Sequence, residues 1–201
     1  MKKLIQRGAS LLVLAGLVLS ASGCATSTAE KLANQFKSGD NKNYVSGDGT
    51  NLEIAYANRG KSIDWAGVTE RGTVLSSANL TGVVTVLNFW YAGCAPCRAE
   101  AKDLEALYKK YLPSKVQFVG VNVRDTAGTA LAFDRNFGMT YPSIIDNTTG
   151  SVVLAFTGVV SPQAVPTTIV VDRKGRVAAR ILGRLEPSTL DAMIQRVVSE
   201  K

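Results

Sequence analysis

The sequence predicts an α/β sandwich with a mixed central β-sheet flanked by helices. Two nearly continuous apolar runs, Val83–Trp90 and Val116–Val123, have the length and composition of buried parallel strands. A pattern with helical spacing follows each of them. Near the C-terminus, 167–172 and 176–182 read as an antiparallel hairpin, and Pro187 then opens a helix. At 201 residues with 46% hydrophobic content, one domain can bury a full core.

The first 23 residues have the pattern of an export signal. Their start is basic, and the apolar run at 11–19 is too short for a comfortable membrane span. Small residues then precede Cys24, which resembles the bacterial lipobox, where the cysteine is lipidated and becomes the mature N-terminus. The alternative is an ordinary signal peptide cut nearby, with Cys24 incidental. The lipobox interpretation predicts a chain anchored by lipid to the extracytoplasmic face of a bacterial membrane.

The next segment, 24–61, is predicted to be the lipidated N-terminus and a polar tether, and the folded domain to span 62–201. A weak alternation at Leu52, Ile54 and Tyr56 allows the end of the tether to dock as an edge strand. A β-hairpin is expected at the start of the domain, with strands near 63–68 and 73–75.

The rest of the domain alternates between helical and extended patterns. A helix should follow the Cys94–Cys97 segment and end at Pro113, with Leu104, Leu107, Tyr108 and Tyr111 on one face. The remaining expected elements are a helix at 126–137, an extended piece at 141–146, a helical turn at 152–156 and a helix at 187–200.

Charge and composition exclude several classes of function. The net charge of +7 falls to about +4 without the three basic residues of the signal segment, and the chain has no basic cluster, so nucleic acid is not an expected partner. The chain contains no histidine, which rules out Ser-His and Cys-His dyads and histidine metal ligands. We therefore expect no metal and no cofactor.

The pair Cys94 and Cys97 carries the chemistry. Such a pair serves as half of a zinc site, as a structural disulfide or as a redox couple. Zinc would need two further ligands that the sequence lacks, and a disulfide across so short a loop stabilises little. A redox couple fits best, because a thiol at a helix start is stabilised as the thiolate, the attacking species in disulfide exchange.

The order of attack follows from position in the predicted helix. Cys94 lies just before the helix, so we expect it to be exposed and to attack first. Cys97 lies inside the first turn, so we expect it to be more buried and to resolve the mixed disulfide. Pro96 fits the first turn without losing a needed hydrogen bond.

The pattern Phe89-Trp90-x-x-x-Cys94-x-Pro96-Cys97 after a buried strand resembles the thioredoxin superfamily, and the resemblance covers residues from about 62 to 200. A second family mark is Val165-Pro166-Thr167 before a strand. The resemblance implies that Pro166 is a cis-proline facing the cysteines and that Val165 lines the site. The alternative for Pro166 is an ordinary proline at a strand entry.

Further residues resemble the membrane-tethered TlpA/ResA branch. Asn88 replaces the buried aspartate of thioredoxin itself, Glu100 lies one helical turn after Cys97, and there is an insertion between Val123 and Ile144. In that branch the glutamate helps to relay protons for the thiols, which requires burial to raise its pKa. The alternative is an exposed glutamate in the first turn that favours the helix dipole.

One residue departs from the family pattern. Gly93 stands where these families usually have tryptophan, so we expect a more open approach to Cys94. Trp90 is interpreted mainly as core, and Asn88 as packing within its strand.

The resemblance implies an exported, lipid-anchored thiol–disulfide oxidoreductase acting on protein thiols. ResA-like and CcsX-like reductases keep the haem-attachment cysteines of apocytochrome c reduced, with electrons from a membrane thiol donor such as CcdA. The expected substrates are therefore protein thiols or disulfides, among them apocytochrome c. The other expected partners are a CcdA-like electron donor and the membrane, and the protein is expected to be a monomer. Alternatives are an oxidase or isomerase for exported proteins, a peroxidase, and a non-enzymatic lipoprotein on the same fold.

Overall fold

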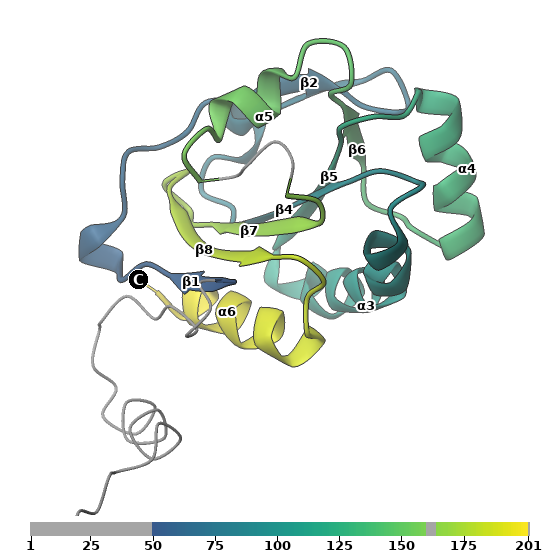
Figure 1. Ribbon diagram of the computed structural model, residues 1–201. Helices are drawn as coiled ribbons and strands as arrows, with labels where there is room; N and C mark the ends of the chain where they lie inside the picture. The colour runs from purple at the N-terminus through teal and green to yellow at the C-terminus, as the bar shows by residue number, and fades with distance from the viewer. Residues whose placement is uncertain (1–49, 160–163, 201) are drawn as a thin grey trace, which may run out of the picture. The chain divides into compact units, whose positions relative to one another are not determined.

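The computed structural model describes residues 50–159 and 164–200 (Figure 1). The expected signal segment and Cys24 lie outside the described residues. Among the described residues, no helix combines the length and the apolar character needed to cross a membrane.

A six-stranded mixed sheet forms the centre of the domain, in the order β1-β8-β7-β4-β5-β6. Its middle strand β4 pairs in parallel with β5 on one side and antiparallel with β7 on the other. The strands are β1 (Asn51–Glu53), β4 (Thr85–Trp90), β5 (Gln117–Asn122), β6 (Ser143–Ile145), β7 (Thr167–Val171) and β8 (Val177–Leu182). The predicted α/β sandwich with a mixed sheet is confirmed.

Side chains of β4 alternate between two hydrophobic clusters, one on each face of the sheet. Val86 and Trp90 belong to the cluster beneath α3 (Ala95–Tyr111) and α6 (Pro187–Ser199), whereas Leu87 and Phe89 belong to the opposite one. Figure 1 shows α3 and α6 on one side of the sheet and α5 (Ser151–Ala155) on the other. Because both faces are covered, every residue of β4 is buried, as its continuous apolar sequence predicts.

The two additions expected around this core are present. The N-terminal hairpin consists of β2 (Ala66–Val68) and β3 (Val74–Ser76), shorter than predicted, and forms its own antiparallel pair. The central insertion folds as α4 (Ala127–Phe137) and leads into β6, which adds to the sheet parallel to β5.

The folded part of the chain begins earlier than residue 62. Strand β1 lies within the segment assigned to the tether and pairs antiparallel with β8 at the sheet edge. The buried side chain of Arg59 forms ion pairs with Asp172 and Glu200. Residues 50–61 therefore belong to the domain, because pairing with a distant strand and a buried ion pair hold them there.

Close packing around the centre of the sheet gives a stability prediction. A Cβ atom on Gly120 of β5 would lie 2.1 Å from Ser143 Oγ and 2.8 Å from Trp90 Nε1. We expect Gly120→Ala to lower the free energy of unfolding by about 1–3 kcal/mol, because this site has no room for a methyl group. Urea denaturation measures the change.

Gly128→Ala in α4 is the matched control, because a Cβ there meets nothing closer than 3.9 Å. It should leave stability unchanged or raise it by up to about 1 kcal/mol, as alanine is the better helix former. Equal effects of the two substitutions would contradict the packing described here.

Candidate active site

The end of β4 and the start of α3 bring Cys94 and Cys97 together as a disulfide. Cys94 is the N-cap residue of α3, and its sulfur accepts a hydrogen bond from the backbone N–H of Cys97 at 3.2 Å. Pro96 lies in the first turn, where its missing N–H costs nothing. The first sulfur therefore lies at the positive end of the helix dipole, where a thiolate is stabilised.

The accessibility of the two sulfurs differs from the expectation. Cys94 and Cys97 are equally buried, each with 3% of its surface exposed. Although Gly93 itself is exposed, the ring of Tyr91 lies beside it, 3.4 Å from where a Cβ atom would be. The expected exposure of Cys94 is therefore wrong for the disulfide form, because its side chain turns inward, joins the α3 cluster of the core and approaches Val165.

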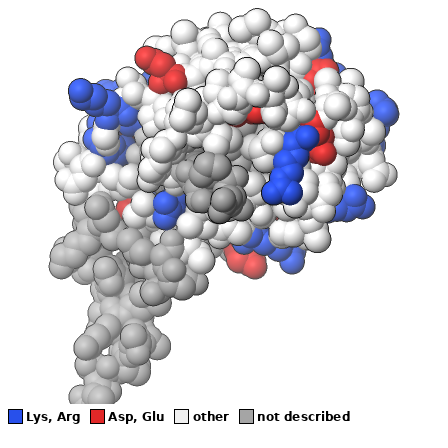
Figure 2. Space-filling model, turned by 45° about the horizontal axis from the view of Figure 1, so that its top comes forward, with Lys and Arg blue, Asp and Glu red and all other residues white. Residues whose placement is uncertain are grey.

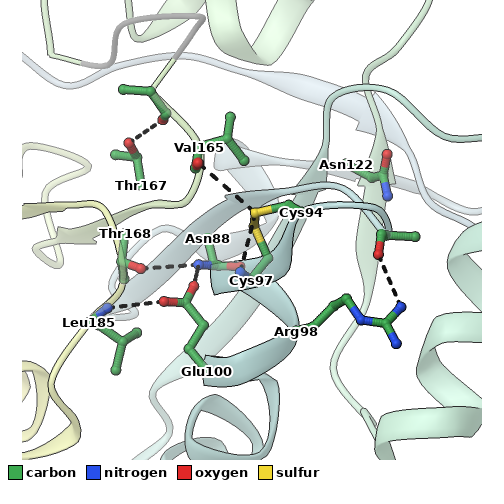
Figure 3. Close-up of a disulfide and its surroundings, with 12 residues drawn as sticks. Asn88, Cys94, Cys97, Arg98, Glu100, Asn122, Val165, Thr167, Thr168 and Leu185 are labelled. Carbon is green, nitrogen blue, oxygen red and sulfur yellow. Dashed lines mark hydrogen bonds between the residues drawn. A yellow bond between two sulfur atoms is a disulfide. The ribbon is translucent and has the colours of Figure 1, made fainter.

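A cis peptide bond between Val165 and Pro166 faces the disulfide, as the motif before β7 predicted. The carbonyl oxygen of Val165 lies 4.0 Å from Cys94 Sγ (Figure 3). This contact is not a hydrogen bond in the disulfide form, since the sulfur carries no proton. The loop is held by the Thr167 hydroxyl, which donates to the carbonyl of Ala164 at 2.6 Å. A polypeptide bound at Cys94 would meet this loop.

Glu100 lies one helical turn after Cys97 and is completely buried. Its Oε1 accepts a hydrogen bond from Asn88 Nδ2 and its Oε2 from the Leu185 backbone N–H, both at 3.0 Å. Burial raises the pKa of this carboxyl group from 4.5 to about 7, even though the two hydrogen bonds and the charge of Arg184 act in the opposite direction. The exposed first-turn glutamate, considered as the alternative, is excluded.

The structure gives Asn88 a role that the sequence analysis missed. Its amide nitrogen donates to Glu100 and also to Thr168 Oγ1 at 3.1 Å, so it links α3 to β7. Figure 3 shows the Asn88 side chain between the Glu100 carboxyl group and the cysteines. The available signal was a lone polar residue in the middle of an apolar strand, since a buried amide needs partners.

A small cavity of about 10 Å³ lies behind Cys97, and Asp134 contributes to its lining with Asn88 and Tyr141. Asp134 is buried, and its Oδ2 has no hydrogen-bond partner among the described residues. Burial, reinforced by the charge of Glu70, raises the pKa of Asp134 to about 6. This residue was also missed, although its place beside Phe133 on the apolar stripe of α4 was the available signal.

Side chains on the far side of the site hold the loop that carries the cysteines. Asp125 accepts hydrogen bonds from the Ala92 backbone N–H at 2.6 Å and from Asn122 Nδ2 at 2.9 Å. Trp90 is 5% exposed and packs on Phe133 with ring centroids 4.3 Å apart, which confirms its assignment to the core. Within the described part of the chain, no cluster of three or more acidic or cysteine side chains could hold a metal ion.

Comparison with known proteins places this geometry in context. A family model described as Redoxin matches residues 55–194. The thiol-disulfide oxidoreductase ResA of a Bacillus cereus strain is 26% identical over 126 residues, which are 63% of this chain and 70% of that protein.

Two solved structures from Corynebacterium are also similar. A DsbF homologue from Corynebacterium diphtheriae has 33% identity and a TM-score of 0.68, covering 76% of this chain and 96% of its own. A secreted thiol-disulfide isomerase from Corynebacterium glutamicum has 29% identity and a TM-score of 0.71, covering 79% and 98%.

The buried Glu100 carboxyl group makes stability depend on pH. Well below pH 4.5 the carboxyl group is protonated in both the folded and the unfolded chain. As pH rises through 4.5 the unfolded chain ionises first, so the free energy of unfolding falls by up to about 3 kcal/mol by pH 7. We expect Glu100→Gln to remove this part of the decrease when the oxidised protein is unfolded in urea between pH 4 and 8.

The buried Asp134 should contribute its own decrease in both proteins, because its pKa is also raised. The exposed Glu186 supplies the control, and Glu186→Gln should keep the wild-type pH dependence. If the free energy of unfolding changed with pH in the same way for wild type and Glu100→Gln, burial would not raise the pKa of the Glu100 carboxyl group.

Proposed function

Because the chain belongs to the Redoxin family and is a thiol–disulfide oxidoreductase of the TlpA/ResA-like branch of the thioredoxin superfamily, we propose that it acts outside the cytoplasm as a reductase of protein disulfides in cytochrome c maturation. The observation that carries the proposal is the buried Glu100 carboxyl group one turn behind Cys97, with a pKa near neutrality. Such a group accepts and returns a proton at the pH where the thiols react.

The reaction proceeds in two exchange steps on the reduced protein. The Cys94 thiolate, stabilised at the N-terminus of α3, attacks a substrate disulfide; a mixed disulfide to Cys94 forms and one substrate thiolate leaves. Cys97 then gives up its proton and attacks Cys94 Sγ, which releases the second substrate thiolate and closes the Cys94–Cys97 disulfide. Two electrons pass to the substrate.

Glu100 takes the proton of Cys97 in this scheme. The Asn88 amide binds the Glu100 carboxyl group and lines the same small cavity as Cys97, so it connects the carboxyl group to the neighbourhood of that thiol. Pro166 and Val165 shape the wall against which the substrate chain lies. A thiol donor of the CcdA type in the membrane would return the two electrons and reduce the pair again.

The proposed location comes from the sequence. The basic start, the short apolar run and Cys24 support export and lipid anchoring, and the similar protein from Corynebacterium glutamicum is described as secreted. Anchoring would hold the domain close to a membrane donor. Apocytochrome c is the proposed substrate, because the resemblance to the TlpA/ResA branch rests on Glu100 and on the inserted α4 and β6.

A second candidate is an exported disulfide isomerase or oxidase. It is favoured by the similar structures from Corynebacterium, one of which is described as a thiol-disulfide isomerase. The two candidates differ in the direction of electron flow, which depends on the reduction potential of the Cys94–Cys97 pair.

A deletion strain distinguishes the two candidates. We expect loss of the gene to lower covalently attached haem in c-type cytochromes, with recovery from the wild-type gene or an added small thiol but not from Cys94→Ser. The measured potential of the purified domain should be more reducing than that of the oxidant DsbA, about −120 mV. Normal cytochromes together with a potential in that oxidising range would favour the isomerase or oxidase.

A trapping experiment tests the order of attack. Cys97→Ser should accumulate a mixed disulfide between Cys94 and the natural substrate, because the resolving thiol is missing. Non-reducing gels followed by mass spectrometry of the adduct identify the partner. Cys94→Ser is the matched control and should trap little; adducts that accumulate only in this control would reverse the assigned roles.

A further inference from the structure

Apart from Arg173 and Arg180, which donate to backbone carbonyl groups, the arginine side chains of the described residues fall into two groups. One group forms ion pairs within the domain: Arg59, Arg71, Arg176 and Arg196. Arg98, Arg124, Arg135 and Arg184 form no ion pair within residues 50–159 and 164–200, and all four are exposed. This division matters because the unpaired group gathers around the cysteines.

Three of these arginines are tied to the active-site loop or its neighbours. Arg98 directly follows Cys97, and its guanidinium donates to the Ala92 carbonyl at 3.5 Å (Figure 3). The same guanidinium lies over the Phe137 ring, 5.4 Å from its centroid. Arg124 lies over the Tyr91 ring, 4.2 Å from its centroid. Arg184 adjoins Leu185, whose N–H binds Glu100.

An open groove between α3 and α4, of about 520 Å³, runs beside the loop that carries the cysteines. Its lining residues are Ala92, Arg98, Thr129, Ala132, Phe133, Arg135 and Asn136. We call it the α3–α4 groove. Two arginines and no acidic side chain line it, and one lining residue, Ala92, is two residues before Cys94. Figure 2 shows basic side chains, with some acidic ones among them, on the right of the face in view, the side on which α4 lies in Figure 1.

Nearby carboxylates do not neutralise the groove. Asp125 is turned into the loop by its bonds to Ala92 and Asn122. Asp134 is buried behind Cys97, and Glu186 lies beyond Arg184 at the start of α6. A guanidinium that rests on an aromatic ring loses less side-chain entropy when it binds, and its planar fork matches a carboxylate. The guanidinium groups that line the groove are therefore available to bind carboxylates from outside the domain.

We propose that the α3–α4 groove binds acidic residues that flank the reactive cysteine of the protein substrate. A polypeptide with its sulfur at Cys94 that extends past Ala92 enters this groove, because Ala92 is one of the residues that line it. An extended chain advances about 3.3 Å per residue, so the carboxylates should lie within about four residues of the substrate cysteine. This inference rests on the oxidoreductase function proposed above and adds the chemical class of the substrate segment.

Matched peptides test the inference. Three mixed-disulfide peptides share one core sequence and differ only in the residues that flank the cysteine. These residues have acidic side chains in the first peptide, uncharged amide side chains in the second and basic side chains in the third. A small thiol in excess returns the Cys94–Cys97 pair to the reduced state after each turnover, and its own reaction with each peptide is subtracted. We expect kcat/KM for reduction by the wild-type domain to follow the order acidic, amide, basic, and the differences to shrink when salt is raised from about 0.02 to about 0.5 M, because exposed charges are screened.

Arg135→Glu should lower kcat/KM about fivefold for the acidic peptide, since an exposed ion pair contributes up to about 1 kcal/mol, and should leave the amide peptide unchanged. Lys115→Glu makes the same change of charge beyond the far end of α3 and should affect no peptide. Equal kcat/KM for acidic and amide peptides, or equal effects of the two substitutions, would overturn the inference.

Failure of the underlying function gives a different result. If the amide peptide were not reduced at all, the proposed oxidoreductase activity on peptides would fail instead. The groove can still be tested by binding alone. An acidic peptide with serine in place of cysteine is added to the oxidised domain, and binding is monitored by the backbone amide chemical shifts of the domain. Shifts at Thr129, Ala132 and Asn136 that Arg135→Glu abolishes support it, and the absence of such shifts contradicts it.

Discussion

The burial of the Glu100 carboxyl group is the constraint on which the rest of the site depends. Three segments meet at this group: α3 supplies it, β4 contributes Asn88, and the connection between β8 and α6 contributes the Leu185 N–H. Each carboxyl oxygen has one of these donors. Burial still disfavours the charged form more than the two bonds favour it, so the group titrates close to neutral pH.

The fold connects this carboxyl group to the sulfur chemistry. Because α3 begins at the disulfide, a single helical turn brings Glu100 beneath Cys97, while the helix N-terminus faces Cys94. The antiparallel pairing of β7 with β4 brings the Val165–Pro166 loop to the other side of the sulfurs. One sulfur is thus placed for attack and the other for proton loss, and both arrangements follow from the ends of neighbouring elements.

Most of the fold and half of the site could be predicted from the sequence. Continuous apolar runs predicted β4 and β5, and the Cys-x-x-Cys spacing predicted a cysteine pair at the start of a helix. The position of Glu100 one helical turn after Cys97 predicted that its side chain lies near the pair. These signals are local. The burial of Cys94, the bonds of Asn88 and the pairing of β1 with β8 depend on contacts between segments far apart in the chain, such as Leu185 with Glu100. A single sequence does not contain that information.

The central claim is that burial in the folded protein raises the pKa of the Glu100 carboxyl group, beside the redox pair, to near neutral pH. A titration of Glu100 itself tests this claim most directly. The side-chain carboxyl carbon is followed by ¹³C NMR in the oxidised domain from pH 4 to 9, and its signal is assigned by its absence in Glu100→Gln. The structure predicts a midpoint at about pH 7. A midpoint near 4.5, the ordinary value for glutamate, would contradict the account.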